Sequence, residues 1–241
     1  MTTKFVLLAS MRTGSNLLNS KLNQYPGVVC HGEAFNPSFV GLAPQYLSRF
    51  GVEREATADR DMDAGAFLDL IMNIEAEAVG LHMFPGHNPA ILRKLLDDRE
   101  VKKICLRRSV FHSFVSLLVA RKTDVWRVTN SGNAQPLSLA DKQVVFKPAE
   151  FEEYRVKVDG FWKSTFHILT KSHQDHFAIW YRETSDAAKL NRLAAFLGIA
   201  SRKKGLADLL AKQNPEPLAE LVQNWEEMVD YARSINLEHQ L

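Results

Sequence analysis

The sequence predicts a single α/β domain in which a mostly parallel central sheet of about five strands is flanked by helices. Two observations carry this prediction. Short apolar runs that suit buried strands alternate with segments of helical periodicity along most of the chain. In addition, 241 residues of which 46% are hydrophobic can bury one large core, and nothing in the sequence requires a second domain.

The predicted elements follow one another in regular order. Residues 5–9 are five consecutive apolar residues, typical of a strand buried in a parallel sheet, and Leu18 and Leu22 then recur at helical spacing. Asn88 and Pro89 combine a capping side chain with a first-turn proline, which indicates a helix start. The same criteria predict strands at 4–10, 28–31, 78–83, 101–107 and 175–181, and helices at 15–24, 63–76, 89–97, 109–122, 148–171, 186–197 and, with an amphipathic pattern, 217–235.

Residues 124–150 interrupt this alternation. Their stretch 129–136 is rich in turn-forming residues, and a loop this long in a compact domain is usually a lid, a binding loop or disordered. We predict a lid or acceptor-binding loop here, with Trp126 as a wall of the acceptor site. Packing between subunits is the alternative role for Trp126.

The loop between the first strand and the first helix is predicted to bind phosphate. It brings Arg12 and Gly14 to a helix start, where backbone N–H groups without intrahelical partners and the positive end of the helix dipole favour an anion. Gly14 lets the backbone approach the ligand, and Arg12 adds a forked, permanently charged donor. The alternative is an ordinary helix start with no ligand.

This loop differs from a Walker A motif, which needs a leading glycine and a lysine before the hydroxyl residue. Strand 101–107 also ends in arginine, where a Walker B strand would end in aspartate. The predicted ligand therefore carries phosphates and needs no metal. A P-loop nucleotide kinase or hydrolase is the alternative within the same fold class, and both differences count against it.

A second strand and helix carry a further candidate site. Arg107 and Arg108 end strand 101–107, at the edge where open α/β sheets bind ligands, and Ser116 lies on the helix that follows. An arginine and a hydroxyl could converge there on one anion. Alternatively, the arginines hold a carboxylate, and Ser116 is solvated or bonded to its own backbone.

Together these two stretches resemble the sulfotransferases that use 3′-phosphoadenosine 5′-phosphosulfate (PAPS). In that family a strand, loop and helix near the N-terminus hold the 5′-phosphosulfate, and an Arg followed eight residues later by a Ser holds the 3′-phosphate; Arg108 and Ser116 have that spacing. The sequence is more similar still to the bacterial branch with trehalose 2-sulfotransferase and the nodulation-factor sulfotransferases. The segment 116–126 is similar in sequence to that branch, and so are the segments 32–37, 79–84, 181–184, 193–198, 213–215 and 224–225.

The resemblance implies transfer of a sulfuryl group from PAPS to a hydroxyl of a carbohydrate or small-molecule acceptor, leaving 3′,5′-adenosine diphosphate. It implies in-line transfer without a metal, since a sulfuryl group carries fewer charges than a phosphoryl group. Tyr181 matches a family tyrosine that packs near the adenine, with plain aromatic packing as the alternative. The implied donor-binding residues are Arg12, Thr13, Gly14, Ser15, Asn16, Arg108, Ser116 and Tyr181.

For catalysis, Arg12 is expected to stabilise the leaving group, and three residues compete to be the base. Glu33 is the first choice, because the trehalose-type members use a glutamate in the corresponding loop. His31 has a near-neutral ordinary pKa, which suits a base. His82 stands where many relatives carry a lysine that contacts the transferring group. Alternatively, Glu33 is merely solvated and the histidines are core residues.

Composition narrows the partners and the cellular location that the protein could have. A formal net charge of +2 argues against nucleic acid as a partner, and no stretch approaches the roughly 18 apolar residues of a membrane span. Cys30 and Cys105 lie in apolar runs and are expected to be buried thiols. We expect a cytoplasmic protein and leave open whether it forms a homodimer. A non-catalytic nucleotide-binding protein is a further alternative. The basic run 202–205 is interpreted as a solvated turn, with contact to the donor as the alternative.

Overall fold

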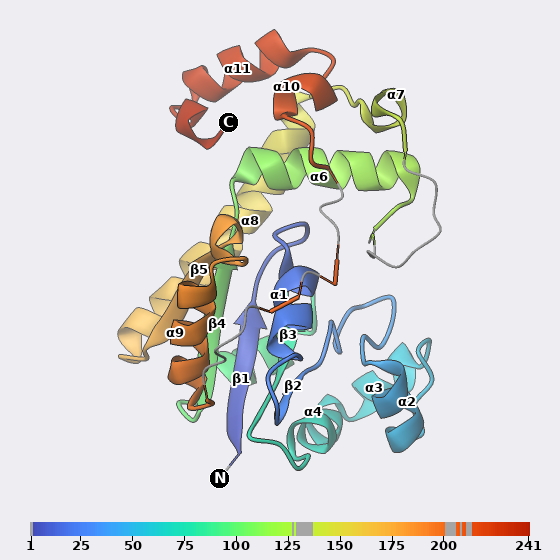
Figure 1. Ribbon diagram of the computed structural model, residues 1–241, viewed down its shortest axis with the longest axis vertical. Coiled ribbons are helices and arrows are strands. Elements are labelled where there is room, and N and C mark those ends of the chain that lie inside the picture. Colours follow the sequence, from blue (N-terminus) through green and yellow to red (C-terminus); the bar gives the residue numbers. More distant parts are fainter. Residues whose placement is uncertain (1, 127, 129–136, 201–205, 208, 211–213) are drawn as a thin grey trace.

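The computed structural model describes residues 2–126, 128, 137–200, 206–207, 209–210 and 214–241. Its centre is a five-stranded sheet in the order β2-β3-β1-β4-β5, and all four neighbouring pairs are parallel. The predicted fold class is therefore confirmed (Figure 1). The strands are β1 (Thr3–Leu8), β2 (Val28–Cys30), β3 (Ala78–Met83), β4 (Val101–Arg107) and β5 (His176–Trp180).

The strand order fixes where a ligand can bind. The chain goes from β1 to β2 and β3 on one side, and later to β4 and β5 on the other side. The strand order therefore reverses at β1, whose residue Leu7 lies opposite His82 of β3 and Ile104 of β4. Open α/β sheets bind ligands at such a switch point, beyond the carboxyl ends of the strands.

Helices cover both faces of the sheet (Figure 1). On one face, α1 (Ser15–Leu22) and α9 (Ala187–Leu197) pack against Phe5 and Leu7 of β1. On the other face, residues of three helices pack against Val6 and Leu8. Successive side chains of β1 thus point to opposite faces of the sheet, and each face is covered by an apolar layer, as a parallel sheet requires. The three helices are α4 (Ala64–Met72), α5 (Pro89–Asp97) and α8 (Pro148–Lys171), and α2 (Pro44–Phe50) and α3 (Thr57–Met62) follow β2.

A third cluster of buried side chains lies beyond the carboxyl edge of the sheet, around α6 (Val110–Thr123). Its centre is aromatic: the rings of Phe111 and Phe151 stack with centroids 4.3 Å apart, and Phe114 and Phe146 pack around them. This cluster anchors α6 above the sheet edge (Figure 1). The remaining elements there are α7 (Leu139–Lys142), α10 (Leu218–Leu221), α11 (Trp225–Ser234) and the short 3₁₀ helix η2 (Glu238–Gln240), while η1 (Tyr181–Glu183) follows β5.

The single helix predicted over 217–235 is wrong. The chain turns extended at Val222, which pairs with Val144 in an isolated parallel bridge. The Val144 N–H donates to the Leu221 carbonyl over 2.8 Å, and the Gln223 N–H donates to the Val144 carbonyl over 2.9 Å. These bonds replace intrahelical ones, so α10 and α11 are separate helices. The predicted helix over 63–76 is likewise shorter, and α2, α3 and α7 were not predicted.

The cysteines Cys30 and Cys105 are buried free thiols, as predicted. Burial raises the pKa of the Cys105 thiol to about 12, and it raises that of Cys30 as well. The thiol form is the unreactive one, so both behave as small apolar residues of the sheet.

In the part of the chain that the structure covers, no helix combines the length and the apolar character needed to span a bilayer.

Candidate functional site

The loop after β1 makes a tight turn into α1. Arg12 and Gly14 both have left-handed backbone conformations, with φ of 65° and 88°. A Cβ on Gly14 would lie 2.4 Å from the Tyr181 ring, so only glycine allows that ring to pack here. No side chain caps the start of α1, and its first N–H groups therefore face the loop. The Thr13 hydroxyl donates to the Ser10 carbonyl over 2.7 Å, which stabilises the turn.

Residues far apart in the sequence meet at this loop. The Arg12 Nε donates to the Ser116 hydroxyl of α6 over 3.2 Å, and Nη1 donates to the Trp126 carbonyl over 2.7 Å. The Arg108 Nη1 donates to the Arg12 carbonyl over 2.8 Å, and its guanidinium lies 4.4 Å from the centre of the Tyr181 ring. The structure thus brings together Arg12, Gly14, Arg108, Ser116 and Tyr181, which the sequence predicted as one site.

The charge of this cluster is positive. Burial lowers the pKa of Arg12, and the like charge of Arg108 lowers it further. Burial also lowers the pKa of Arg108, and none of the described carboxylates forms an ion pair with it. Arginine stays charged even so, because its ordinary pKa is above 12. Two guanidinium groups held together in a half-buried site favour an anionic ligand.

Two further residues complete the surroundings of this cluster. Asn214 lies with Nδ2 3.5 Å from the Ser116 hydroxyl, and its Oδ1 is buried without a partner among the described residues. The Tyr154 hydroxyl donates to the Met11 carbonyl over 3.4 Å, and burial raises its pKa to about 12. Tyr154 was missed because nothing in the sequence of α8 distinguishes it from a packing residue. Asn214 stood in a stretch of family resemblance, without a predicted role.

Of the other predicted phosphate-binding residues, Ser15 and Asn16 form the first turn of α1. Ser15 is buried, while Asn16 is exposed. The Thr13 side chain is turned to Ser10, so the backbone of this residue is what the loop can offer to a ligand. The basic run 202–205 lies outside the described residues.

Glu33 is held as an ionised carboxylate beyond the end of β2. Its Oε2 accepts a hydrogen bond from Asn36 Nδ2 over 2.8 Å and lies 3.4 Å from His87 Nε2. Burial alone would raise the pKa of Glu33. The hydrogen bonds from His87 and Asn36 outweigh this and hold the pKa below its ordinary value. Arg60 of α3 fixes the loop, because its Nη1 donates to the Ala34 and Asn36 carbonyls.

The two histidine candidates are more deeply enclosed. His82 of β3 is fully buried, and burial lowers its pKa to about 4; neither ring nitrogen has a partner among the described residues. His31 donates from Nε2 to the Ile71 carbonyl of α4 over 2.9 Å, and burial lowers its pKa to about 4 as well. Both rings are therefore neutral at physiological pH, and His31 faces α4 and the Tyr46 ring.

Glu33, His82 and the cluster around Arg12 follow β2, β3 and β1, which are neighbours in the sheet. They consequently share one edge. Within the described residues, no group of three or more His, Cys, Asp or Glu side chains is placed to hold a metal ion.

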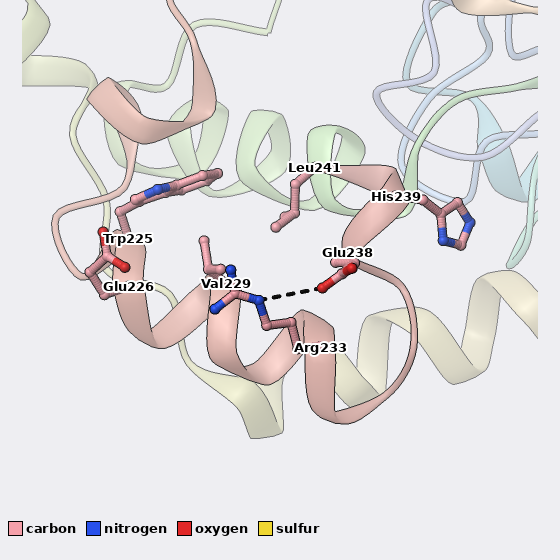
Figure 2. A pocket seen from close by; sticks show the side chains of 7 residues that line it. All are labelled: Trp225, Glu226, Val229, Arg233, Glu238, His239 and Leu241. Atoms are coloured by element: carbon pink, nitrogen blue, oxygen red, sulfur yellow. Dashed lines mark ion pairs between the residues drawn. The ribbon is translucent and has the colours of Figure 1, made fainter.

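A surface hollow of about 570 Å³ lies elsewhere, on α11 and η2. Figure 2 shows Trp225, Val229 and Leu241 lining it beside the ion pair of Arg233 and Glu238, whose nitrogen and oxygen are 3.4 Å apart. It contains none of the residues of the β1 loop. The candidate site is therefore the edge of the sheet.

No family model matches the chain. A nodulation protein H of Rhizobium tropici is 26% identical over 232 residues, which cover 93% of this chain and 87% of that protein. Among solved structures, a sulfotransferase from Alicyclobacillus acidocaldarius superposes with a TM-score of 0.50 at 15% identity, covering 99% of this chain and 95% of its own. A sulfotransferase domain from the curacin biosynthetic pathway gives a TM-score of 0.51 at 13% identity, covering 98% of both chains. The chain therefore has the fold of these sulfotransferases, and the relative from Rhizobium tropici matches it along nearly its whole sequence.

Proposed function

We propose that this enzyme transfers the sulfuryl group of PAPS to a hydroxyl of a carbohydrate or another small molecule, and releases 3′,5′-adenosine diphosphate. The observation that carries the proposal is the convergence of Arg12, Arg108 and Ser116 beside the start of α1. The loop after β1, the end of β4 and helix α6 together supply a positive, half-buried site at the switch point of the sheet. Such a site suits a nucleotide that carries anionic groups at two positions.

Each part of the donor has a counterpart in this arrangement. The 5′-phosphosulfate would bind the loop of Arg12, Thr13 and Gly14 and the first turn of α1, Ser15 and Asn16. The 3′-phosphate would bind Arg108 and Ser116. The adenine would pack near Tyr181, whose ring already lies against Gly14 and under the Arg108 guanidinium. The contact between Arg12 and Ser116 supports placing the two anionic ends close together.

Transfer needs a base and a stabilised leaving group. In the proposed step the acceptor oxygen attacks sulfur in line, its proton passes to Glu33, and the sulfur–oxygen bond to the phosphate breaks with its electron pair on the phosphate. Arg12 and the α1 amides would stabilise that charge without a metal. Accessibility favours Glu33, because its side chain is partly exposed whereas His31 and His82 are buried. His82, which lies close enough to act electrostatically on Glu33, is the second candidate.

We place the acceptor beside Trp126. Its carbonyl accepts from Arg12, and 46% of the residue is exposed, so an aromatic surface is available next to the reacting end of the donor. Aromatic side chains of this kind pack well against sugars and other partly apolar molecules. A lid formed by 124–150, a cytoplasmic location and a homodimer stay predictions.

Calorimetric titration with 3′,5′-adenosine diphosphate tests the donor site. We expect it to bind at least roughly tenfold more tightly than adenosine 5′-monophosphate, because hydrogen bonds to a charged group contribute about 1.5–3 kcal/mol. Replacing Arg108 by methionine should remove most of this difference. Arg93→Met is the matched control, since the Arg93 side chain is 65% exposed on α5 and pairs with Asp97 at the surface. Equal affinity of the wild type for both nucleotides would contradict the proposal.

The acceptor is found by incubating the protein with labelled PAPS and a mixed metabolite extract, and then identifying what acquires sulfate. Tight binding of 3′,5′-adenosine diphosphate without any transfer would favour a non-catalytic nucleotide-binding protein. Turnover of nucleoside triphosphates that depends on magnesium would favour the kinase or hydrolase alternative.

A further inference from the structure

His87 lies against the proposed base, Glu33. It follows β3 in the turn before α5 and is 5% exposed. Its Nδ1 accepts a hydrogen bond from the Phe84 N–H over 3.2 Å, and its Nε2 lies 3.4 Å from Glu33 Oε2. The ring also stacks on Phe84, with centroids 5.0 Å apart. The hydrogen bond from the Phe84 N–H and the stacking on the Phe84 ring together fix the position and the rotation of the His87 ring.

The Phe84 contact determines which ring nitrogen carries the proton. A backbone N–H can only donate, so Nδ1 must offer a lone pair and carry no hydrogen. The hydrogen of the neutral ring is therefore on Nε2, which points at Glu33. Protonating Nδ1 would break the Phe84 bond. His87 is consequently a fixed donor toward the carboxylate and is poorly arranged to receive a proton from it.

The two oxygens of Glu33 are not equivalent. Both donors, Asn36 Nδ2 and His87 Nε2, reach Oε2. Within the described residues, no hydrogen bond or ion pair to Oε1 is formed. The carboxylate is thus held by one oxygen, and the other is left for an acceptor hydroxyl.

We propose that His87 is a positioning residue, which holds Glu33 through its Nε2–H so that Oε1 takes the proton of the acceptor hydroxyl. The role rests on the proposed function, in which Glu33 is the base. In the step the acceptor O–H bond breaks, its proton forms a bond to Oε1, and His87 keeps its own hydrogen. The 3.4 Å contact is long for a hydrogen bond, and such contacts in catalytic sites often tighten when substrate binds.

Other titratable groups act on this pair and have to be separated from it. His82 of β3 lies in the field of both Glu33 and His87, and His31 beyond β2 acts on His82. Arg60 of α3 binds the backbone of the Glu33 loop through carbonyl groups. A test must therefore change His87 and leave these residues in place.

Two substitutions separate the two contacts of the ring. In His87→Asn the side-chain oxygen replaces Nδ1 and still accepts from Phe84, but nothing reaches Glu33. In His87→Gln the amide nitrogen replaces Nε2 and still donates to Glu33. The probe is the titration of the Glu33 carboxyl carbon by NMR in the full chain, assigned with Glu33→Gln and followed wherever circular dichroism shows the chain folded. His173→Asn is the control, because His173 is exposed and has a left-handed backbone that asparagine tolerates.

We expect the Glu33 midpoint to rise in His87→Asn and to stay near the wild-type value in His87→Gln and His173→Asn. Nitrogen NMR should show hydrogen on Nε2 of His87 in the wild type. With PAPS and the acceptor that the metabolite-extract assay identifies, kcat should fall roughly tenfold or more in His87→Asn, with the KM for PAPS unchanged, and should recover in His87→Gln.

An unmoved Glu33 midpoint in His87→Asn, or hydrogen on Nδ1 in the wild type, would overturn the proposal. Wild-type kcat in His87→Asn alongside an inactive Glu33→Gln overturns the positioning role alone. Wild-type kcat in Glu33→Gln overturns the base assignment and with it the role of His87, even if the NMR result is as expected. The failures of the two proposals can thus be told apart.

Discussion

Replacing Arg12 by alanine is expected to lower kcat by about 10²- to 10³-fold, and to weaken donor binding as well. Negative charge on the bridging oxygen grows as the sulfur–oxygen bond breaks, so a cation at this position stabilises the transition state more than the bound donor. Arg12 is suited to this because it belongs to the loop itself and is oriented by Ser116 and by the Trp126 carbonyl. The measurement is kcat and the KM for PAPS at saturating acceptor.

Arg12→Lys refines this test. Lysine keeps the charge but has no planar fork, so it cannot reproduce both contacts that orient Arg12. We expect kcat between those of the wild type and Arg12→Ala. Arg93→Ala is the control, since Arg93 is 65% exposed on α5 and pairs only with Asp97 at the surface among the described residues. If Arg12→Ala kept the wild-type kcat and raised only the KM for PAPS, Arg12 would be a binding residue without a part in the chemical step.

Much of the donor-site geometry could be predicted because its signals are local. The run into Gly14 specifies a strand, a loop and a helix within a few residues, and parallel strands bring the residues at their ends to one edge. Even so, Arg12 and Ser116 are 104 residues apart, and what joins them is the anchoring of α6 over the sheet edge. The spacing of Arg108 and Ser116 indicated through family resemblance, not through the physics of the sequence, that these two residues share one site. It did not indicate the contact of Ser116 with Arg12.

What could not be predicted depends on contacts between distant segments. The amphipathic pattern of 217–235 is real, and Leu218, Leu221 and Val222 are indeed buried. The helix breaks because a bridge to Val144 competes with its backbone bonds, and a periodicity cannot show this. Similarly, the sequence ranked Glu33 first only through family resemblance, and it could not show that Glu33 is partly exposed while both histidines are buried. His87 lies near Glu33 only because β2 and β3 are neighbours.

Replacing Glu33 by glutamine is expected to reduce kcat by about 10²- to 10⁴-fold, the usual contribution of a general base. The amide has nearly the same shape as the carboxyl group, and its oxygen can still accept from Asn36 and His87, so the loop should keep its conformation. The amide cannot accept a proton at neutral pH. The KM for PAPS should stay close to that of the wild type, because the donor site lies on other residues. The measurement is the rate of labelled sulfate transfer over a pH series.

The pH dependence follows from the direction of the Glu33 shift. The base works in its ionised form, so activity is lost as pH falls through the pKa of Glu33, which lies below the ordinary glutamate value of 4.5. The acid limb of the wild-type kcat profile should therefore lie below that value, and Glu33→Gln should lack it. The exposed Glu55→Gln, on the segment before α3, serves as a control for loss of one negative charge. Near-wild-type turnover of Glu33→Gln across the series would exclude Glu33 as the base and leave His82, whose neutral ring would have to become accessible to the acceptor.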